Sequence, residues 1–203
     1  MIFEKLYNHD NAIFTSVNTL YSYIPIPKNS STLLRQIFIN MGYTNKNTII
    51  DNERVIICLR DPIDRWFSGI TEYVHRHYFE TGLLSKLSDA NIKKIFKEKI
   101  YDEHTYPQTY FLPNNLNLDN TIFFDNKRIV SDISDFYLNQ FGTVLDLTDL
   151  VQYRIQDDTV KINIMTQLKS YYDTNTEIKY ELLELYNEDY KLIENATVYN
   201  VDK

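Results

Sequence analysis

Residues 54–68 have the sequence Arg-Val-Ile-Ile-Cys-Leu-Arg-Asp-Pro-Ile-Asp-Arg-Trp-Phe-Ser. The apolar run from Arg54 to Leu59 is typical of a strand that is buried on both faces of a parallel sheet. Asp61 and Pro62 are residue types preferred at the N-cap and the first position of a helix, which we expect to continue to about Tyr78. A buried strand that passes directly into a helix is typical of α/β domains.

The same alternation continues on both sides of this stretch. Apolar periodicity predicts the following further elements: a strand over 21–26, a helix over 33–41 ending before Gly42, a helix around 92–100, a strand over 121–124, a helix over 133–141 ending at Gly142, and a long helix from about residue 176. The order predicts one α/β domain over residues 1–203, with a central parallel sheet flanked by helices. Ligands of such folds bind beyond the carboxyl ends of the strands.

The composition excludes several classes of protein. The 203 residues carry a net charge of −7, which argues against general nucleic-acid binding because that requires a basic surface. The lone cysteine, Cys58, excludes a disulfide scaffold and predicts a core thiol. No stretch approaches the ~18 apolar residues of a membrane span, and no signal-peptide pattern is present, so we expect a cytoplasmic protein without a membrane partner.

The first loop that follows a strand has the sequence Pro27-Lys28-Asn29-Ser30-Ser31-Thr32, with Leu33 already in the helix. Backbone N–H groups at a helix start attract anions, the two hydroxyls of Ser31 and Thr32 add donors, and Lys28 adds a positive charge. The loop therefore suits a phosphate or a sulfuryl group, and an ordinary helix cap beside a surface lysine is the alternative. It lacks the glycines of a Walker A loop, so a nucleoside-triphosphate kinase or GTPase is disfavoured.

The second loop begins at Arg60, where a guanidinium at the end of a buried strand needs an anion or a carboxylate. Arg60 and Ser68 could hold one phosphate from two directions. The alternative is that Arg60 pairs with Asp61 or Asp64 while Ser68 only packs.

Together the two loops resemble the paired signature of the sulfotransferases that use 3′-phosphoadenosine 5′-phosphosulfate (PAPS). Pro-Lys with small hydroxyl residues is similar to their 5′-phosphosulfate site, and Arg-Asp-Pro followed by Arg and Ser is similar to their 3′-phosphate site. The segment Asp102-Glu103-His104-Thr105-Tyr106-Pro107-Gln108 resembles the carbohydrate sulfotransferase branch. That branch carries a membrane anchor and disulfides, so the chain resembles a soluble relative of the kind that bacterial or viral genomes encode.

The resemblance implies a P-loop-like, three-layer fold and the transfer of a sulfuryl group from PAPS to a carbohydrate hydroxyl, without a metal, leaving 3′-phosphoadenosine 5′-phosphate (PAP). The expected cofactor-binding residues lie in both loops: Pro27, Lys28, Asn29, Ser30, Ser31, Thr32, Leu33, Arg60 and Ser68. Lys28 is the expected catalytic cation at the leaving phosphate oxygen. The expected substrate-binding residues are Arg65, Glu72 and Gln108.

An acceptor hydroxyl needs a base whose pKa lies near neutrality, which favours histidine. His104 is the first candidate, with Glu103 beside it to orient the ring, and His75 is the second because it shares a helix face with Ser68. Glu72 is the third candidate. A structural histidine before Pro107 is the alternative for His104.

Two other functions stay open at this point. The first is a non-catalytic nucleotide-binding or virion-associated protein of the same fold. The second is a phosphoryl transferase, which is disfavoured by the missing glycine-rich loop and by the lack of an obvious metal-binding carboxylate at a strand end.

Overall fold

The computed structural model describes residues 13–16, 20–46, 53–82, 86–142, 144–147 and 158–199. The contacts within the chain divide it into two units. Unit 1 comprises residues 1–60, 108–155 and 192–203, and unit 2 comprises residues 61–107 and 156–191. The expectation of a single domain over residues 1–203 stays a prediction.

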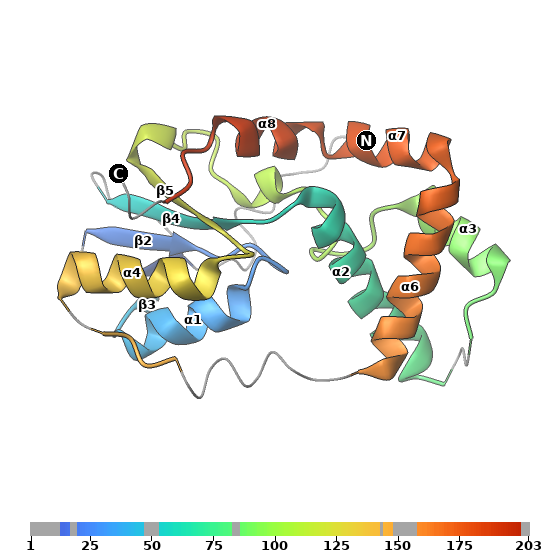
Figure 1. Ribbon diagram of the computed structural model, residues 1–203, viewed down its shortest axis with the longest axis horizontal. Helices are drawn as coiled ribbons and strands as arrows, with labels where there is room; N and C mark the ends of the chain where they lie inside the picture. Colours follow the sequence, from blue (N-terminus) through green and yellow to red (C-terminus); the bar gives the residue numbers. More distant parts are fainter. Residues whose placement is uncertain are drawn as a thin grey trace. The chain divides into compact units, whose positions relative to one another are not determined.

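Unit 1 is built on a five-stranded sheet with the strand order β3-β1-β2-β4-β5 (Figure 1). The strands are β1 (Ile13–Thr15), β2 (Tyr21–Ile24), β3 (Thr44–Lys46), β4 (Arg54–Leu59) and β5 (Thr121–Asp125). β4 has the predicted bounds and pairs in parallel with β2 on one side and with β5 on the other. The carboxyl ends of these three strands therefore lie at one edge of the sheet.

The α/β class is confirmed, but the sheet is mixed, which corrects the expectation of a central parallel sheet. β1 pairs antiparallel with β2 and with β3. Only five residues separate β1 from β2, and a connection this short joins antiparallel strands, because a parallel pair needs a long crossover. β1 and β3 have three residues each, too few to produce a recognisable apolar alternation.

Helices α1 (Ser31–Asn40) and α4 (Ile129–Phe141) cover one face of this sheet (Figure 1). Tyr23 of β2 stacks on Phe38 of α1 with ring centroids 4.7 Å apart. Ile57 of β4 and Phe123 of β5 point to the opposite face and are buried as well, so the prediction of a strand buried on both sides is confirmed. The thiol of Cys58 is buried in the core, as expected. Short 3-10 turns, η3 (Gln108–Phe111) and η4 (Leu118–Asn120), precede β5.

Unit 2 is helical and contains α2 (Pro62–Val74), α3 (Asp89–Glu98), α6 (Thr159–Thr174) and α7 (Thr176–Leu185). Asp61 caps α2 by accepting a hydrogen bond from Asp64 N at 2.8 Å, and Pro62 occupies the first turn, as predicted. After Val74 the chain makes a π-helical turn, η2 (His75–Phe79). The helix predicted to end near Tyr78 therefore consists of an α-helical part followed by a π-helical turn. The expected long C-terminal helix is divided into α7 and α8 (Asn187–Asn195).

The core of unit 2 is aromatic and aliphatic. Trp66 of α2 is fully buried against Phe67 and Phe96, and its indole N–H donates to Lys99 O at 2.7 Å. Ile164 and Leu168 of α6, a helix that the sequence pattern did not predict, complete this cluster. Within the described ranges, no helix combines the length and the apolar composition that a bilayer crossing requires.

Gly69 of α2 lies against the loop that follows α3, where a Cβ at this position would come within 2.2 Å of His104 O. Alanine in place of glycine within a helix normally stabilises it by about 1 kcal/mol. Here we expect Gly69→Ala to lower the free energy of unfolding by about 2 kcal/mol, because the methyl group meets backbone that cannot yield without moving the loop. Urea unfolding of the two proteins measures this difference, and a variant as stable as the wild type would contradict the close approach.

Candidate functional site

The carboxyl edge of the parallel strands brings together three separate segments of unit 1. The turn of residues 27–30 follows β2, Arg60 follows β4, and Asn126 follows β5. Asn126 N donates to Leu59 O at 2.8 Å, which joins the ends of β4 and β5. The two loops singled out by the sequence therefore lie at adjacent strand ends.

Two buried side-chain amides connect the first loop to the second. Asn29 Nδ2 donates to Cys58 O at 2.8 Å and also to Gln108 Oε1. Gln108 in turn accepts from Arg60 N at 3.1 Å and donates to Arg60 O at 2.8 Å. Both amides are fully buried. Because an unpaired amide group in such a place costs about 1–3 kcal/mol, each of these side chains fixes the backbone that it contacts.

The first loop has an unusual backbone at two positions. Lys28 and Ser30 have φ values of 67° and 57°, in the left-handed region that glycine normally occupies. The loop thus adopts, without any glycine, a conformation that glycine normally provides. Non-glycine residues in this region cost energy and cluster at ligand clamps and active sites.

The start of α1 is open to a ligand. Ser30 holds the N-cap position, but its hydroxyl donates to Asn126 Oδ1 at 2.5 Å and makes no capping bond. The backbone N–H groups of residues 31–33 find no acceptor among the residues that the structure describes. Open N–H groups at a helix start, together with the helix dipole, form a site for an anion.

Arg60 reaches the same turn from β4. Its Nη1 donates to Lys28 O at 3.1 Å, so a guanidinium and the lysine that begins the loop belong to one cluster. The carboxylates proposed as alternative partners of Arg60 have roles in unit 2. Asp61 caps α2, and Asp64 lies 3.4 Å from Lys169 Nζ.

The other predicted cofactor residues lie in or near the first loop. The loop and the first turn of α1 contain Pro27, Ser31 and Thr32. The side chain of Leu33 lies in the core, and only its backbone N–H faces the helix start. Gln108, predicted to contact substrate, is buried as a bridge between the loops. Ser68 is half-buried on α2 of unit 2, and its role in phosphate binding stays a prediction.

Two polar residues that the sequence patterns did not predict, Asp125 and Asn126, also lie at this edge of the sheet. β5 ends on Asp125, whose Oδ1 accepts from Lys127 N at 2.9 Å, so a strand does end on a carboxylate, contrary to expectation. The sequence contains a pattern that could have identified them, because an acidic residue and an amide residue directly follow the apolar run Ile122-Phe123-Phe124.

Unit 2 holds the predicted base residues. Arg65 is fully buried, and its Nη1 and Nη2 donate to the backbone carbonyls of Tyr106 and Glu103. Tyr186 donates its hydroxyl to Thr105 O, and burial raises the pKa of this phenol far above 10, so it stays a donor. These contacts hold the loop of residues 102–106, so Arg65 positions this loop. The contact of Arg65 with substrate, which the sequence suggested, stays a prediction.

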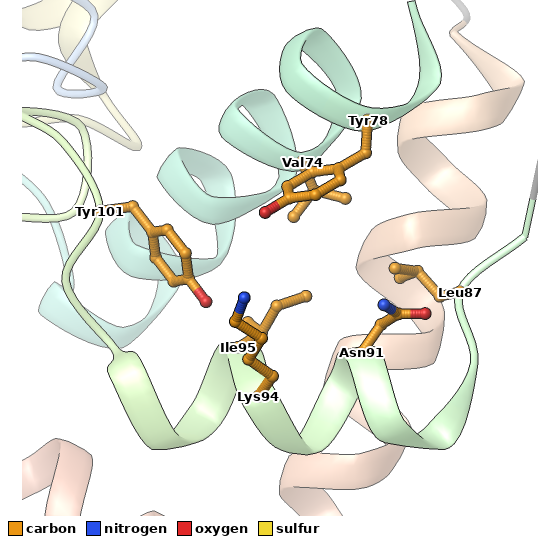
Figure 2. Close-up of a pocket in the computed structure, with 7 residues that line it drawn as sticks. All are labelled: Val74, Tyr78, Leu87, Asn91, Lys94, Ile95 and Tyr101. Atoms are coloured by element: carbon orange, nitrogen blue, oxygen red, sulfur yellow. The ribbon is translucent and has the colours of Figure 1, made fainter. Parts of the chain in front are cut away.

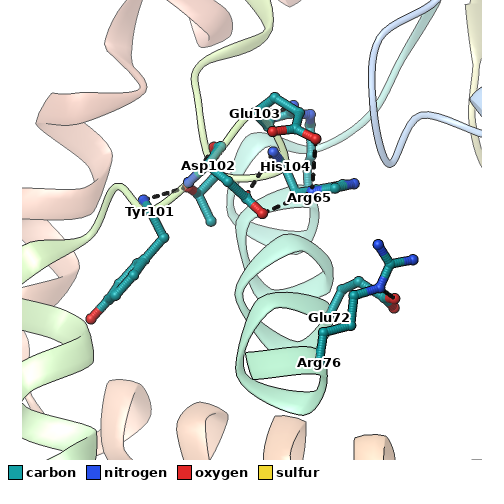
Figure 3. A network of polar contacts seen from close by, with 8 residues as sticks. Arg65, Glu72, Arg76, Tyr101, Asp102, Glu103 and His104 are labelled. Carbon is teal, nitrogen blue, oxygen red and sulfur yellow. Dashed lines mark hydrogen bonds and ion pairs between the residues drawn. The ribbon is translucent and has the colours of Figure 1, made fainter. Parts of the chain in front are cut away.

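The loop carries His104 between two carboxylates (Figure 3). His104 Nδ1 lies 3.1 Å from Asp102 Oδ2 and 3.7 Å from Glu103 Oε1. One ligand-type atom from each of the three side chains lies within 4.8 Å of the other two. A divalent cation could use this spacing, but such exposed acidic groups are common in proteins without an ion, so we assign no metal to the loop.

The second and third candidate bases are engaged by charged partners. His75 Nδ1 lies 3.1 Å from Glu80 Oε1, and its Nε2 lies 3.5 Å from Asp158 Oδ2. Glu72 Oε1 lies 2.6 Å from Arg76 Nε, and Glu72 Oε2 lies 3.0 Å from Lys161 Nζ. Groups held in this way are poorly placed to exchange a proton with a substrate.

A small pocket of unit 2 lies between η2 and α3 (Figure 2). It is lined by Val74, Tyr78, Leu87, Asn91, Lys94, Ile95 and Tyr101, and has a volume of about 50 Å³. Ligand pockets usually measure about 300–1,000 Å³. The cavity is therefore too small for an adenosine nucleotide.

No protein-family model, no curated protein and no solved structure matches the chain.

Two substitutions of Lys28 separate the effect of its charge on stability from the effect of its left-handed backbone. Lys28→Ala and Lys28→Gly both remove the ammonium group, but only glycine accepts a φ of 67° without strain. We expect the glycine variant to unfold with a free energy about 1 kcal/mol higher than that of the alanine variant. Urea unfolding of both variants tests this, and equal stabilities would refute the left-handed conformation.

Asp158 is the N-cap of α6 and accepts hydrogen bonds from Val160 N and Lys161 N at 3.1 Å. The bond from Lys161 N lowers the pKa of this carboxyl below its ordinary value of 3.8, and the nearby His75 and Lys161 charges add to the effect. A lowered pKa in the folded state contributes stability above the ordinary pKa and loses it as the pH falls.

Asp158→Asn keeps the cap but removes this charge. We expect the wild type to be the more stable protein at neutral pH, and the difference to shrink as the pH falls below about 4. Thermal unfolding between pH 3 and pH 7 measures it. A difference that grew on acidification would show that the carboxylate is not stabilised in the fold.

Proposed function

We propose that the chain is a PAPS-dependent sulfotransferase, and that its donor binds at the carboxyl edge of the unit 1 sheet. The observation that carries the proposal is the turn of residues 28–30. Its left-handed Lys28 and Ser30, together with the diverted Ser30 hydroxyl, leave the first N–H groups of α1 available for an anion. The P-loop-like, three-layer architecture expected of this family belongs to the same proposal.

The chemistry of the donor fits the groups that meet there. The phosphosulfate carries negative charge, and transfer of its sulfuryl group places further charge on the phosphate oxygen that departs. Lys28 and the open N–H groups of α1 would stabilise that oxygen, in the manner of donors preorganised for a transition state. Arg60, which contacts the same turn, adds a second positive charge.

The reaction joins the oxygen of an acceptor hydroxyl to sulfur while the bond between sulfur and the phosphate oxygen breaks. PAP leaves with that electron pair, and a base takes the proton of the hydroxyl. The sequence motif that contains His104 favours a carbohydrate as acceptor. A cytoplasmic location, suggested by the sequence alone, is part of the proposal.

Phosphoryl transfer from ATP is the second candidate, and Asp125 at the end of β5 is the observation that favours it. A carboxylate at a strand end beside a phosphate loop is a common position for a Mg²⁺ ligand. The first loop argues against this candidate, because it lacks the G-x-x-x-x-G-K-[ST] arrangement in which lysine follows the glycines.

Thermal unfolding with each nucleotide separates the candidates. We expect PAP without metal to stabilise the protein by about 2.7 kcal/mol at a concentration of about 100 times Kd, because it binds only the folded state. ATP with Mg²⁺ should give a much smaller effect. Lys28→Met should weaken the response to PAP, whereas Asp125→Asn should leave it unchanged.

Three results would count against the proposal. Stabilisation by ATP with Mg²⁺ alone, lost in Asp125→Asn, would favour phosphoryl transfer. If neither nucleotide stabilised the protein, the proposed donor site would be refuted. Binding of PAP without transfer of ³⁵S from labelled PAPS to any carbohydrate would favour a non-catalytic nucleotide-binding protein.

A further inference from the structure

We propose that the small pocket between η2 and α3 binds a short-chain monocarboxylate such as acetate or propionate. All residues that line this pocket belong to unit 2. The inference goes beyond the proposed function, because it needs neither PAPS nor any residue of unit 1. Three features of the pocket support it: its size, its apolar floor and the hydrogen-bond donors that converge on it.

The size and the floor of the cavity favour a small organic ligand. Its volume is about 50 Å³, which is room for about four water molecules, since one water needs about 10–15 Å³ of such space. Acetate has a comparable size. The buried side chains of Val74, Leu87 and Ile95 line the floor. A methyl or methylene group gains from contact with them, whereas an inorganic anion does not.

Asn91 directs an amide donor into the pocket. Its Oδ1 accepts from Ser88 N at 3.1 Å and from the Ser88 hydroxyl, as part of the capping box at the start of α3. Because the oxygen is used in this way, the orientation of the amide is fixed. Figure 2 shows that the nitrogen points towards the cavity. In the described ranges of the chain, Nδ2 makes no hydrogen bond and is available to a ligand.

Tyr78 and Lys94 add a hydroxyl and an ammonium group to the same space (Figure 2). Lys94 Nζ lies 3.8 Å from Glu98 Oε1, which is beyond hydrogen-bond distance, so its N–H groups remain available. The Tyr78 hydroxyl has no hydrogen-bond partner in the described part of unit 2. A carboxylate accepts hydrogen bonds and carries one negative charge, so it matches three donors of which one is a cation.

Tyr101 and Glu98 restrict the charge of the ligand. Burial raises the pKa of the Tyr101 phenol, and a hydrogen bond to Glu98 raises this pKa further, so Tyr101 forms a neutral wall. The Glu98 carboxylate offsets part of the positive charge of Lys94. A dianion such as sulfate would therefore be repelled more strongly here than a monoanion.

The π-helical turn η2 determines the direction of Tyr78. Glu80 N donates to His75 O at 3.0 Å, a bond that spans five residues instead of the four of an α-helix. This wider turn rotates the side chains after Val74 relative to those of a continuous α-helix. Such turns are rare and occur frequently at functional sites. The irregular end of this helix is thus a second, independent indication that the pocket binds a ligand.

Titration of the wild-type protein, followed by ¹H–¹⁵N NMR at constant ionic strength, tests the site. Acetate and acetamide have the same size and shape, but only acetate is charged. We expect acetate to shift the amide signals of the lining residues with a Kd of about 1–10 mM. Acetamide should bind at least about tenfold more weakly. Propionate should bind about threefold more tightly than acetate, because its additional methylene contacts the apolar floor.

Matched variants locate the binding. Asn91→Asp keeps an oxygen that accepts from Ser88, and an acidic residue is favourable in the first turn of a helix, so α3 stays folded. Because this variant replaces the donor by a negative charge, we expect the Kd for acetate to rise at least about tenfold. Lys94→Met should raise it about threefold, since the side chain is 63% exposed and water screens its charge. Lys93→Met, the control, removes the same charge from the neighbouring exposed position and should leave the Kd unchanged.

Four results would overturn the inference. Equal Kd values for acetate and acetamide would show that the pocket does not recognise charge. Equal effects of Lys94→Met and Lys93→Met would indicate non-specific attraction to a basic helix. Displacement of acetate by an equal concentration of sulfate would indicate a general anion site. If acetate and propionate caused no saturable shifts in the wild type, the pocket would hold only water. None of these outcomes depends on the proposed function.

Discussion

The buried contact between the side-chain amides of Asn29 and Gln108 is the constraint on which the unit 1 site depends. Through it the turn after β2 is tied to the backbone at the end of β4, because Asn29 also reaches Cys58 O and Gln108 also reaches both backbone groups of Arg60. These donors and acceptors are withdrawn from water, so a shift of either loop would leave polar groups unpaired. The positions of Lys28 and Arg60 follow from this contact.

The left-handed backbone at Lys28 and Ser30 is understandable once the turn is fixed in this way. Such conformations persist where the surrounding structure determines them more strongly than the local cost opposes them. The side chain of Asn29, the residue between the two, is held by Cys58 O and Gln108 Oε1, and the side chain of Ser30 is held by Asn126. The same restraint that imposes the strain also directs the Ser30 hydroxyl away from the helix start, which leaves the N–H groups of α1 available.

In unit 2, too, buried polar side chains fix the backbone of a loop by hydrogen bonds. Arg65 is fully buried and donates to loop carbonyls, a use of arginine that a surface motif would not suggest. The result is a histidine that differs from the other described candidate in its surroundings. His104 has one carboxylate at hydrogen-bond distance of one nitrogen, whereas His75 has a carboxylate near each nitrogen. This environment distinguishes the two histidines.

The sequence by itself determined the strands β4 and β5, the cap of α2 at Asp61 and the ends of helices at Gly42 and Gly142, because local periodicity and backbone preference act over a few residues. It also indicated the two loops that adjacent parallel strands bring together. Only the tertiary structure decided that the sheet is mixed, that Gln108 is a bridge and that Asp102 rather than Glu103 engages His104. These outcomes depend on pairing between segments distant in the chain and on the exact direction of side chains, which neither composition nor spacing specifies.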